Sequence, residues 1–361
     1  MLHPRYKIQI GSSTFEPDSS DNVLGLLVDL SMDVPSNIFE GHFKIKKQGI
    51  GFTKGDPINV SIGYGGDEEG GRGAAGAMLD VFKGSVDTLQ SRFSTVAVKG
   101  FSSMIKLCSK RIDRFYEQQT AGFVTKDLAS TAGVSIEEVS DGIHFPYYAI
   151  DSNKNGYEHI IQLAHNCGFD AFMNNKDKLV FKKYQPNNQQ TLEYGKNIIQ
   201  VLKVEKKPLV ESVKILAESP SSAKGSDTSH WLTKQQVHGI ARAAAGGGGS
   251  GQGASSITNA IGLTSSAFSS SSSSDPNQVL IHNKSVRDDD TASRVAEAHL
   301  TRIKSSTLIS LRVVGDPKIM LGNTVKIQKM PEDSLNGEYQ VRTVEHLLSK
   351  SAGFTTILKV R

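Results

Sequence analysis

Apolar and polar residues alternate along most of the first hundred positions. Runs such as "YKIQI", "PINVSIG" and "STVAVKG" place an apolar side chain at every second position, and Gly and Asp separate such runs about every ten residues. A period of two is that of a half-buried β-strand, and short strands at this spacing are typical of an antiparallel barrel or sandwich. Residues 1–105 are therefore predicted to form a first β-barrel.

Helical periodicity appears after this region. "FSSMIKLCSK" is predicted as a short helix, and 125–133 as another, with Thr125 as its N-cap and Gly133 just past its end. In "NGYEHIIQLAHNCGF" one helical face carries Tyr157, Ile160, Ile161 and Ala164, and Gly168 follows the end. "DAFMNNKDKLVFKKY" is predicted as a strand, a turn and a strand. Residues 106–200 are therefore predicted to be a small α+β unit.

Alternation returns in residues 201–361, which are predicted to form a second β-barrel. A Ser/Gly-rich insert at about 219–277 interrupts it, and so little apolar surface predicts a flexible segment. Trp231 lies there in "SHWLTKQQVHGIARAA", which fits either a short amphipathic helix that docks on a partner or a loose loop with one apolar anchor. "DDDTASRVAEAHLTRIKSS" predicts a helix whose N-terminus is favoured by three aspartates.

One pattern occurs twice in the chain. Gly55 precedes an alternating run and Gly84 a second one, and near the C-terminus Gly322 and Gly337 do the same. Both passages close with an alternating strand, "STVAVKG" and "FTTILKV". The simplest account is a duplicated small β-barrel, with the α+β unit between its copies and the four glycines at turn positions. Such matches also arise by chance in β-rich chains, so the pattern alone leaves duplication open.

Three passages together resemble the phage late control D family, the tail hub proteins of contractile phage tails and related injection systems. They are "VFKGSVDTL…VAVKGFSSMIKL", "GFVTKDLASTAGVSIEEVSDGI…NGYEHIIQLAHNCGFDAFMNNKDKLVFKK" and "RVAEAHLTRI…VVGDPKIMLGNTVKIQ…LNGEYQVRTVEHLLSKSAGFTTILKV". The resemblance covers most of the chain except the Ser/Gly-rich insert. It depends on turn glycines and apolar rhythm, and no catalytic residue contributes to it.

The resemblance implies a mechanical function. Each protomer of such a hub carries two barrels similar to the tail-tube subunit, so a homotrimer presents six barrels to a hexameric tube and threefold symmetry to a trimeric spike. The expected partners are other copies of this chain, the tail-tube protein, the spike protein and other baseplate proteins. VgrG-like proteins fuse such a hub to a spike, whereas this sequence ends just after the second barrel, so the spike is expected to be a separate protein.

Composition narrows the remaining possibilities. The net charge is +4 and no block of five or more basic residues occurs, so nucleic-acid binding is not expected. Two cysteines, Cys108 and Cys167, fit a reducing compartment better than a disulfide framework. The N-terminus lacks a signal-like apolar region, and no apolar run approaches the ~20 residues that span a bilayer. We expect a protein made in the cytoplasm, without a membrane anchor, that becomes part of a tail-like particle.

Three motifs suggest ligands but fit them poorly. "GRGAAG" has dinucleotide-loop spacing, yet strand-like sequence follows it where a helix is needed. "DSNKNGYEHIIQ", residues 151–162, approaches a calcium loop but ends in Gln162 instead of a bidentate Glu, so a turn entering a helix is the preferred interpretation. His159, His165 and Cys167 lack the spacing of a zinc or a thiolate–imidazole site. No cofactor or metal is predicted.

Neither a nucleophile motif nor a pair of acid–base carboxylates stands out, so the chain is predicted not to be an enzyme. Two alternatives to the hub stay open. One is a β-rich module that binds glycans or cell wall, although aromatic residues make up 7% of the chain and are dispersed. The other is a tail-associated peptidoglycan hydrolase. The sequence does not distinguish a phage from a bacteriocin or an extracellular injection system.

Overall fold

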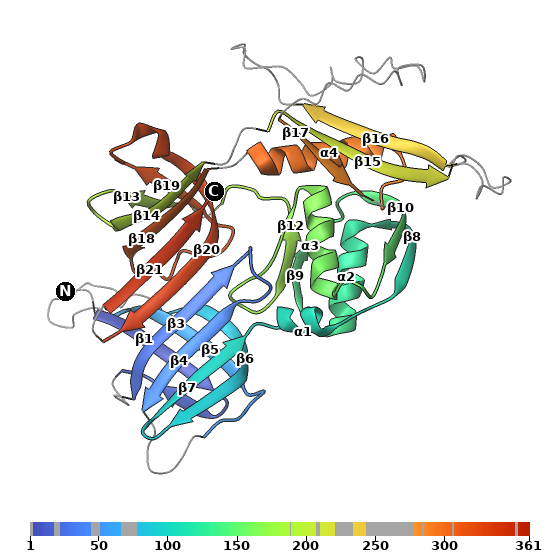
Figure 1. Cartoon of the computed structure of the whole chain (residues 1–361). Helices are drawn as coiled ribbons and strands as arrows, with labels where there is room; N and C mark the ends of the chain where they lie inside the picture. Colours follow the sequence, from blue (N-terminus) through green and yellow to red (C-terminus); the bar gives the residue numbers. More distant parts are fainter. Residues whose placement is uncertain are drawn as a thin grey trace. The chain divides into compact units, whose positions relative to one another are not determined.

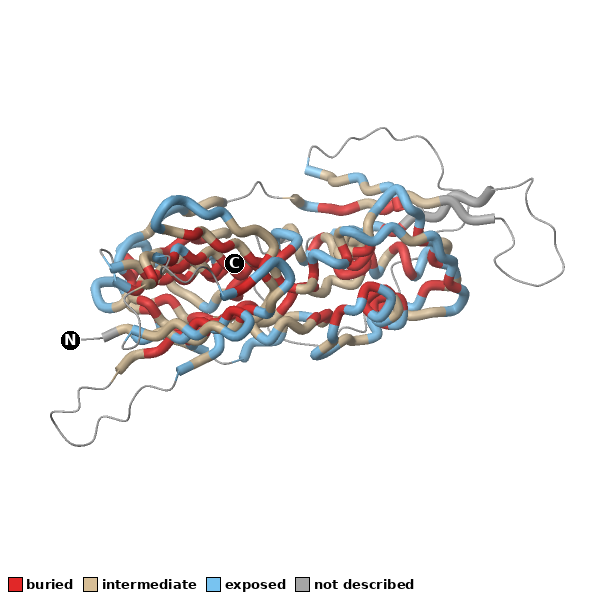
Figure 2. Tube along the Cα trace, turned by 90° about the horizontal axis from the view of Figure 1, so that it is seen from below, coloured by how far each residue is buried: buried red, intermediate tan, exposed pale blue. Residues whose placement is uncertain are grey.

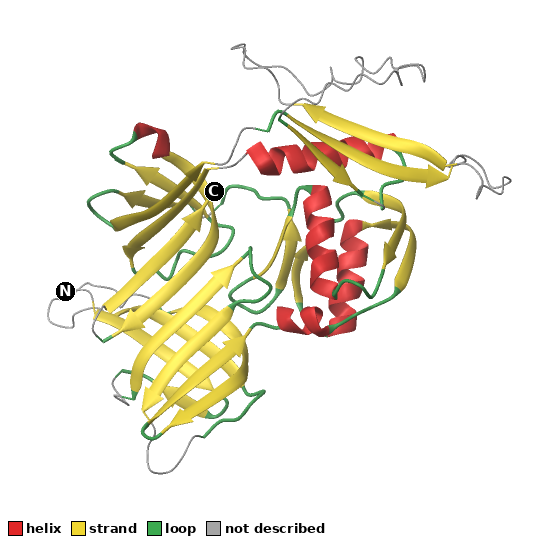
Figure 3. Cartoon of the chain, in the orientation of Figure 1, coloured by secondary structure: helices red, strands yellow, loops and turns green. Residues whose placement is uncertain are grey.

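The computed structural model describes residues 3–17, 22–44, 51–65, 78–187, 189–206, 210–220, 234–242, 277–283, 285–304, 307–350 and 353–361. Contacts divide the chain into two compact units, one formed by Met1–Lys207 with Ser305–Arg361 and the other by Pro208–Lys304. Strands dominate and a few helices accompany them, which confirms the predicted mainly β, α+β class (Figure 3). The boundaries predicted at 105 and 200 stay predictions.

One large sheet organises the larger unit (Figure 1). Its thirteen strands are β1 (His3–Ile10), β2 (Ser13–Phe15), β3 (Val23–Ser31), β4 (Ile38–Lys44), β5 (Pro57–Gly65), β6 (Leu79–Arg92), β7 (Thr95–Phe101), β13 (Gln190–Glu193), β14 (Ile198–Lys206), β18 (Thr307–Val314), β19 (Thr324–Gln328), β20 (Gly337–Ser349) and β21 (Gly353–Val360). The pairing order is β14-β18-β21-β20-β3-β4-β7-β6-β5-β1-β2, and β19 pairs with both β20 and β13.

The pairings of the described strands form an open path, and none of them closes a barrel. The first and second halves of the chain meet edge to edge where β3 pairs with β20. Alternation of apolar and polar residues predicts strands with one buried face, but it is the same in an open sheet and in a closed barrel. The strand content of the sequence prediction is therefore confirmed, whereas the described strands do not form the two predicted closed barrels.

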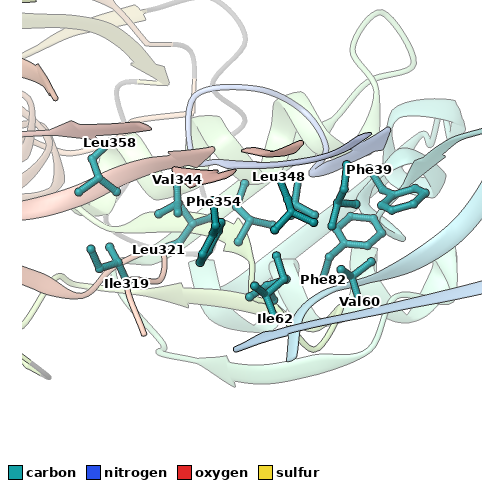
Figure 4. Packing of buried hydrophobic residues seen from close by; sticks show 14 of the residues in the cluster. Phe39, Val60, Ile62, Phe82, Ile319, Leu321, Val344, Leu348, Phe354 and Leu358 are labelled. Carbon is teal, nitrogen blue, oxygen red and sulfur yellow. The ribbon is translucent and has the colours of Figure 1, made fainter. Parts of the chain in front are cut away.

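Both halves contribute to one hydrophobic core. Buried residues recur at every second position of the central strands, as in β4, where Phe39, Gly41 and Phe43 alternate with more exposed residues. Figure 2 colours the described residues by burial and shows buried segments interspersed with exposed ones. Figure 4 shows Phe39 and Phe82 of the first half in the same layer as Val344 and other residues of the second half. The shared core explains why the two halves form one compact unit.

The segment between the halves combines helices and short strands, and we call it the α+β unit. It comprises α1 (Met104–Ser109), β8 (Arg114–Thr120), α2 (Ala121–Ala132), β9 (Ile136–Val139), β10 (His144–Ile150), α3 (Gly156–Cys167), β11 (Asp170–Met173) and β12 (Leu179–Lys182). β8 and β10 form a two-stranded ribbon, and β11-β12-β9 a small sheet. The β11–β12 hairpin is confirmed. Helix α3 starts with a capping box between Asn155 and Glu158.

Helix α2 begins earlier than predicted. Its N-cap is Thr120, whose side chain accepts a hydrogen bond from the Phe123 amide. Thr125, the predicted cap, lies inside the helix, where its hydroxyl donates to the Ala121 carbonyl over 2.8 Å. The prediction of Thr125 was wrong because both threonines can cap, and the buried positions of α2 extend back to Ala121.

The smaller unit joins a three-stranded sheet to one helix. Its elements are β15 (Ser212–Pro220), β16 (Lys234–Arg242), β17 (Gln278–His282) and α4 (Asp289–Lys304), and the strand order is β16-β15-β17. Strand β16 lies within the insert predicted to be flexible, and it occupies much of the segment for which a helix was considered. Trp231 and the rest of the insert, as well as residues 66–77 with the "GRGAAG" motif, lie outside the described residues.

Candidate functional site

The large sheet contains the same strand arrangement twice. In the first half the pairing order is β3-β4-β7-β6-β5-β1, and in the second half it is β14-β18-β21-β20-β19-β13. The matched strands also follow one another in the same order along the chain. One difference is that β1 pairs with β5 antiparallel, whereas β13 pairs with β19 parallel. We call these the first and second strand sets.

Two of the predicted turn glycines occupy equivalent places in the two sets. Gly55 has a φ of 93° and Gly322 a φ of 77°, and each precedes the strand that follows its turn. The Gly55 amide donates to the Val86 carbonyl over 2.8 Å, and the Gly322 amide donates to the Val341 carbonyl over 3.0 Å. Each valine amide in turn donates to the carbonyl of the residue after the glycine, over 2.9 Å in both sets. Val86 and Val341 therefore match.

Substitution of these glycines should destabilise the fold because L-residues are strained at positive φ. We expect Gly322→Ala and Gly55→Ala each to lower the free energy of unfolding by about 1–2 kcal/mol. Gly25→Ala is the matched control, since its added Cβ would have no neighbour closer than 3.9 Å and its φ is not positive. Urea unfolding followed by circular dichroism measures the difference. Equal effects at Gly25 and Gly322 would contradict the turn assignment.

The other two predicted turn glycines lie inside strands and do not match each other. Gly84 lies in β6 opposite Ile58. With Gly55 aligned to Gly322, Ile58 corresponds to Val325, but the residue opposite Val325 is Tyr339. Gly337 is the first residue of β20, two positions before Tyr339. The sequence alignment of Gly84 with Gly337 is therefore wrong by two residues, a shift that leaves every side chain on the same face.

Matching bulges support the equivalence of the two sets. The register of β6 against β7 shifts between Val86 and Thr88, and the register of β20 against β21 shifts between Val341 and Thr343. These are the positions just after the two matched valines. A bulge inserts one unpaired residue and is a specific feature of a strand. Its recurrence at the same place supports an internal duplication of the strand set.

The equivalence extends across the next strands. Val86 lies opposite Gly100 and Val341 opposite Val360, so β7 matches β21. Gly100 in turn lies opposite Phe39 of β4, and Val360 opposite Ile309 of β18. These pairs fix the residue-by-residue match of the two sets.

The match reaches β3 and β14. Phe39 lies opposite Val28 and Ile309 opposite Val204, so Val28 of β3 corresponds to Val204 of β14. Both strands have a register shift near their start, β3 between Val23 and Gly25 and β14 between Ile198 and Gln200. Strand β14 has a further shift between Val201 and Lys203. Its outer edge is therefore less regular than that of β3.

The two sets meet at an internal seam, the antiparallel pairing of β3 with the second half of β20. It runs from Thr343 opposite Ser31 to Ser349 opposite Gly25. The core-facing residues of this half of β20 are Val344, His346 and Leu348, which lie opposite Leu30, Val28 and Leu26 and are all buried. This seam shows how one strand set of this protein docks on the next.

His346 is a buried titratable group in this seam. One of its ring nitrogens, Nδ1, lies 3.0 Å from the Thr356 hydroxyl, and the side chain is 1% exposed. Burial disfavours the charged imidazolium and lowers the pKa of His346 to about 4. The histidine is therefore neutral in the folded protein at neutral pH.

The seam should lose stability in acid. Because the pKa of His346 lies below that of an unfolded histidine, near 6.5, only the unfolded chain binds this proton between about pH 6.5 and 4. The contribution of His346 is complete above pH 6.5 and falls with decreasing pH, with a slope approaching about 1.4 kcal/mol per pH unit. The unfolding free energy of His346→Gln, which cannot titrate, should fall less than that of the wild type. Parallel curves from pH 7 to 4.5 would contradict this.

On its opposite face the seam places two carboxylates together. Asp29 of β3 lies directly opposite Glu345 of β20. Burial raises the pKa of both groups. The charge of Asp29 raises the pKa of Glu345 further, whereas Lys359 stabilises both charged carboxylates and partly offsets these shifts. Like charges directly opposite one another weaken a strand pair. The seam is held by its apolar face and its backbone bonds despite this pair.

A buried arginine joins the two strand sets to the α+β unit. Arg342 of β20 is 3% exposed, and its guanidinium lies 2.7 Å from Asp33, just after β3, and 2.9 Å from Asp170 of β11. The second oxygen of Asp170 accepts a hydrogen bond of 2.6 Å from Gln340. Arg342 occupies the bulge of β20. Sequence reasoning missed this cluster, because its members are far apart along the chain.

Within the described residues, the calcium-like loop and His159 have structural roles. In the calcium-like loop Asp151 accepts from the Asn153 amide, and Lys154 contacts Gln162 over 2.8 Å, so the interpretation as a turn entering α3 is confirmed. His159 is buried and its Nε2 lies 3.0 Å from the Asp151 carbonyl. Among the described residues, no group of three or more His, Cys, Asp or Glu side chains is arranged to hold a metal ion. No described helix combines the length and apolar character needed to span a membrane.

Comparison with solved structures gives matches over the whole chain. The 43 kDa tail protein of prophage MuSo2 from Shewanella oneidensis has a TM-score of 0.66 at 14% identity, covering 99% of this chain and 98% of its own. The tail protein from Neisseria meningitidis MC58 has a TM-score of 0.66 at 12% identity, covering 99% and 96%. No protein-family model and no curated protein matches the sequence.

A third match is the Escherichia coli c3393 protein, a component of the type VI secretion system with structural similarity to the T4 bacteriophage tail proteins gp27 and gp5. Its TM-score is 0.52 at 9% identity, and the match covers 98% of this chain and 76% of that one. The likeness to tail proteins that the sequence indicates is thus confirmed at the level of the fold: this chain has the fold of phage tail proteins.

Proposed function

We propose that this chain is the structural baseplate hub of a contractile phage tail or a phage-tail-like injection system. In this proposal it is a homotrimer that adapts a hexameric tube to a trimeric spike, and it catalyses no reaction. Its partners are the tail-tube protein, the spike protein and other baseplate proteins. It is made in the cytoplasm and becomes part of the particle.

The observation that carries the proposal is the duplicated strand set. One chain holds two sets with matched strand order, turns and bulges. Three copies would offer six similar sets to a sixfold tube while keeping threefold symmetry toward a spike. The whole-chain likeness to tail proteins supports the same conclusion.

The predicted tube-protein-like barrels belong to this proposal. In one chain the strand path is open, and an exposed sheet edge invites pairing with another chain. A ring of copies removes such edges, because each set pairs with the next. We therefore propose that the barrel wall is completed only in the assembled trimer.

The test is loss of the gene in a strain that makes the particles. We expect no complete tail-like particles without this protein and full recovery when a tagged copy is supplied, with the tag at the spike end of the tube in immunogold micrographs. Particles of normal morphology without the protein would contradict the proposal. Clearing of peptidoglycan in a gel assay of the purified chain would favour the hydrolase instead.

A glycan-binding role is a second candidate, since the ribbon of β8 and β10 carries an exposed aromatic pair. Phe115 is 57% exposed and Tyr147 46%, and their rings stack with centroids 5.7 Å apart. Exposed aromatic faces can stack on sugar rings. Binding of the purified protein to cell-wall glycans that disappears in Phe115→Ala/Tyr147→Ala would favour this role, and unchanged binding would exclude this pair as its site.

A further inference from the structure

Several strand edges of the large sheet have a described neighbour on one side only, and two of them match the strands of the internal seam. One is the second half of β6, residues 87–92, which pairs with β7 but lies beyond the end of its pairing with β5. The other is β14, which pairs with β18 and ends the strand path. Figure 1 shows them in different strand sets, and six strands separate them in the pairing order. We call them the β6 edge and the β14 edge.

These two edges are the counterparts of the strands that form the internal seam. The match of Val86 with Val341 makes the β6 edge equivalent to the half of β20 that pairs with β3. The match of Val28 with Val204 makes β14 equivalent to β3. The protein therefore carries one complete seam and, in its two strand sets, the separate halves of a second.

Apolar side chains on the β6 edge are exposed where their counterparts in the seam are buried. Leu89 is half-buried, whereas its counterpart Val344 is fully buried. Four positions further on, Phe93 is 112% exposed at the tip of the β6–β7 hairpin, whereas its counterpart Leu348 is 8% exposed. Burial of this Phe against another chain would remove a large apolar surface from water.

The β14 edge shows the same contrast. Val204 is half-buried and its counterpart Val28 is fully buried; Val201 is half-buried and its counterpart Leu26 is 3% exposed. Next to them Ile199 is 53% exposed. Both edges thus carry apolar side chains that are less buried than their counterparts in the internal seam.

We infer that the β6 edge of one copy, with Phe93 at its tip, pairs antiparallel with the β14 edge of the next copy in the register of the internal seam. Thr343 corresponds to Thr88, so Glu345 corresponds to Gln90; on the other strand Asp29 corresponds to Glu205. The inference rests on the proposed function, because it names the surface through which the copies of the hub meet.

In the second seam, the pair that corresponds to the two opposed carboxylates of the internal seam carries a single charge. The like-charged pair of Asp29 with Glu345 becomes Glu205 opposite a neutral Gln90, which removes one repulsion. Arg92 comes opposite Lys203, but Lys203 contacts Glu205 on its own strand, and this carboxylate offsets part of the repulsion between the two cations. Phe93 comes opposite Val201, where it covers the half-buried end of the core.

The second seam requires another copy of the chain, since the two edges belong to different strand sets and six strands separate them in the pairing order. Repeating the seam from copy to copy is a head-to-tail contact, which forms a ring when its rotation closes. In a threefold ring, three internal and three intermolecular seams would alternate. The open strand path of the single chain is then the expected state of a protomer.

Crosslinking tests the register. In a background with Cys108→Ala and Cys167→Ala, the pair Gln90→Cys/Glu205→Cys places two thiols on opposed strands of different copies. Opposed residues have Cβ atoms about 4.5–5.5 Å apart, within reach of mild oxidation or a short bis-maleimide. We expect covalent dimers and trimers on a denaturing gel. Monomers at every concentration, or a bond within one chain, would overturn the inference.

Two matched pairs control the experiment. Asp29→Cys/Glu345→Cys marks the internal seam and should crosslink within one chain, which shows that the geometry and the chemistry work. Gln90→Cys/Gln200→Cys is four matched positions out of register, about 13 Å along the strand, and should remain uncrosslinked. Equal crosslinking of the 90/205 and 90/200 pairs would indicate unspecific contact and would also overturn the proposed register.

Phe93 gives an independent readout. Because its side chain is fully exposed in the single chain, Phe93→Ala should leave the unfolding midpoint unchanged. Loss of its burial against the next copy should weaken association by roughly 10- to 100-fold, as measured by sedimentation equilibrium. Phe123→Ala, at another exposed aromatic residue outside both edges, is the control. An unchanged association constant for Phe93→Ala would remove Phe93 from the interface.

Failure of this inference and failure of the hub function are distinguishable. Threefold particles that contain the protein but give no 90/205 crosslink would overturn the seam and leave the hub standing. Closed crosslinked trimers of a protein that is absent from any tail-like particle would do the reverse.

Discussion

Arg342→Met should destabilise the protein more than any surface substitution. Methionine keeps much of the apolar stem but removes the guanidinium that lies between Asp33 and Asp170, and Asp170 is only 13% exposed. A buried carboxylate that loses its cation pays a desolvation cost which the pair had offset, so we expect a loss of about 3–5 kcal/mol in the free energy of unfolding. The β11 region should also become more sensitive to proteases, because Arg342 ties it to β20.

Two variants separate the charge effect from general damage. Lys99→Met removes the exposed ion pair of Lys99 with Glu40, in which both side chains are about 40% exposed, and should cost less than about 1 kcal/mol. Adding Asp170→Asn to Arg342→Met should recover part of the loss, since the unpaired charge is gone. A loss below about 1 kcal/mol for Arg342→Met, in urea unfolding at pH 7, would show that the cluster does not tie the α+β unit to the strand sets.

Gly84→Val should be nearly as damaging, whereas Gly337→Val should not. An added Cβ at Gly84 would lie 2.4 Å from the Phe101 carbonyl oxygen and 2.7 Å from the Phe82 ring, so the backbones of β6 and β7 would have to move apart. Overpacking typically costs about 1–3 kcal/mol, and a clash with a carbonyl oxygen should lie at the upper end of this range. At Gly337 the nearest atom to an added Cβ is 3.6 Å away, in Tyr339, and the φ is not positive.

The comparison is made by the thermal unfolding midpoint of the two variants and the wild type. We expect a large decrease in the unfolding midpoint for Gly84→Val and only a small change in the midpoint for Gly337→Val. Similar effects at both sites would contradict the crowding that distinguishes Gly84 from Gly337. Gly84→Ala, which adds the Cβ alone, should already show most of the decrease.

Much of this fold could be predicted from the periodicity of apolar residues in the sequence. Alternation indicated the strands of both sets, helical periodicity indicated α3 and α4, and the repeated glycine pattern indicated the duplication. Gly55 and Gly322 could be paired because a turn that needs positive φ favours glycine. These features are local, so they leave a mark in short stretches of sequence.

Alternation could not show that Gly84 and Gly337 do not match, because a shift by two residues keeps every side chain on its face. A different signal was present. The apolar residues Val86 and Leu89 are three positions apart, as are Val341 and Val344, and this slip in phase marks the bulge in both sets. Aligning the slips instead of the glycines gives the match that the hydrogen bonds show.

Other features depend on contacts between distant segments. Arg342 meets residues 309 and 172 positions away, and no local pattern predicts that meeting. Strand β16 lies in sequence rich in small residues, yet Ala241 is buried and Gly239 lies against Ala292 of α4, so tertiary packing decides its structure. Deletion of residues 223–274 would remove β16 and should therefore unfold the smaller unit, contrary to the expectation for a loop.

The most direct test of the hub is electron cryomicroscopy of the particle that contains this chain, averaged without imposed symmetry. The account predicts a threefold ring at the end of the tube, in which each protomer contributes two strand sets and β6 of one protomer lies beside β14 of the next. A ring of six copies, a single copy per particle, or the protein at a site away from the tube would contradict it.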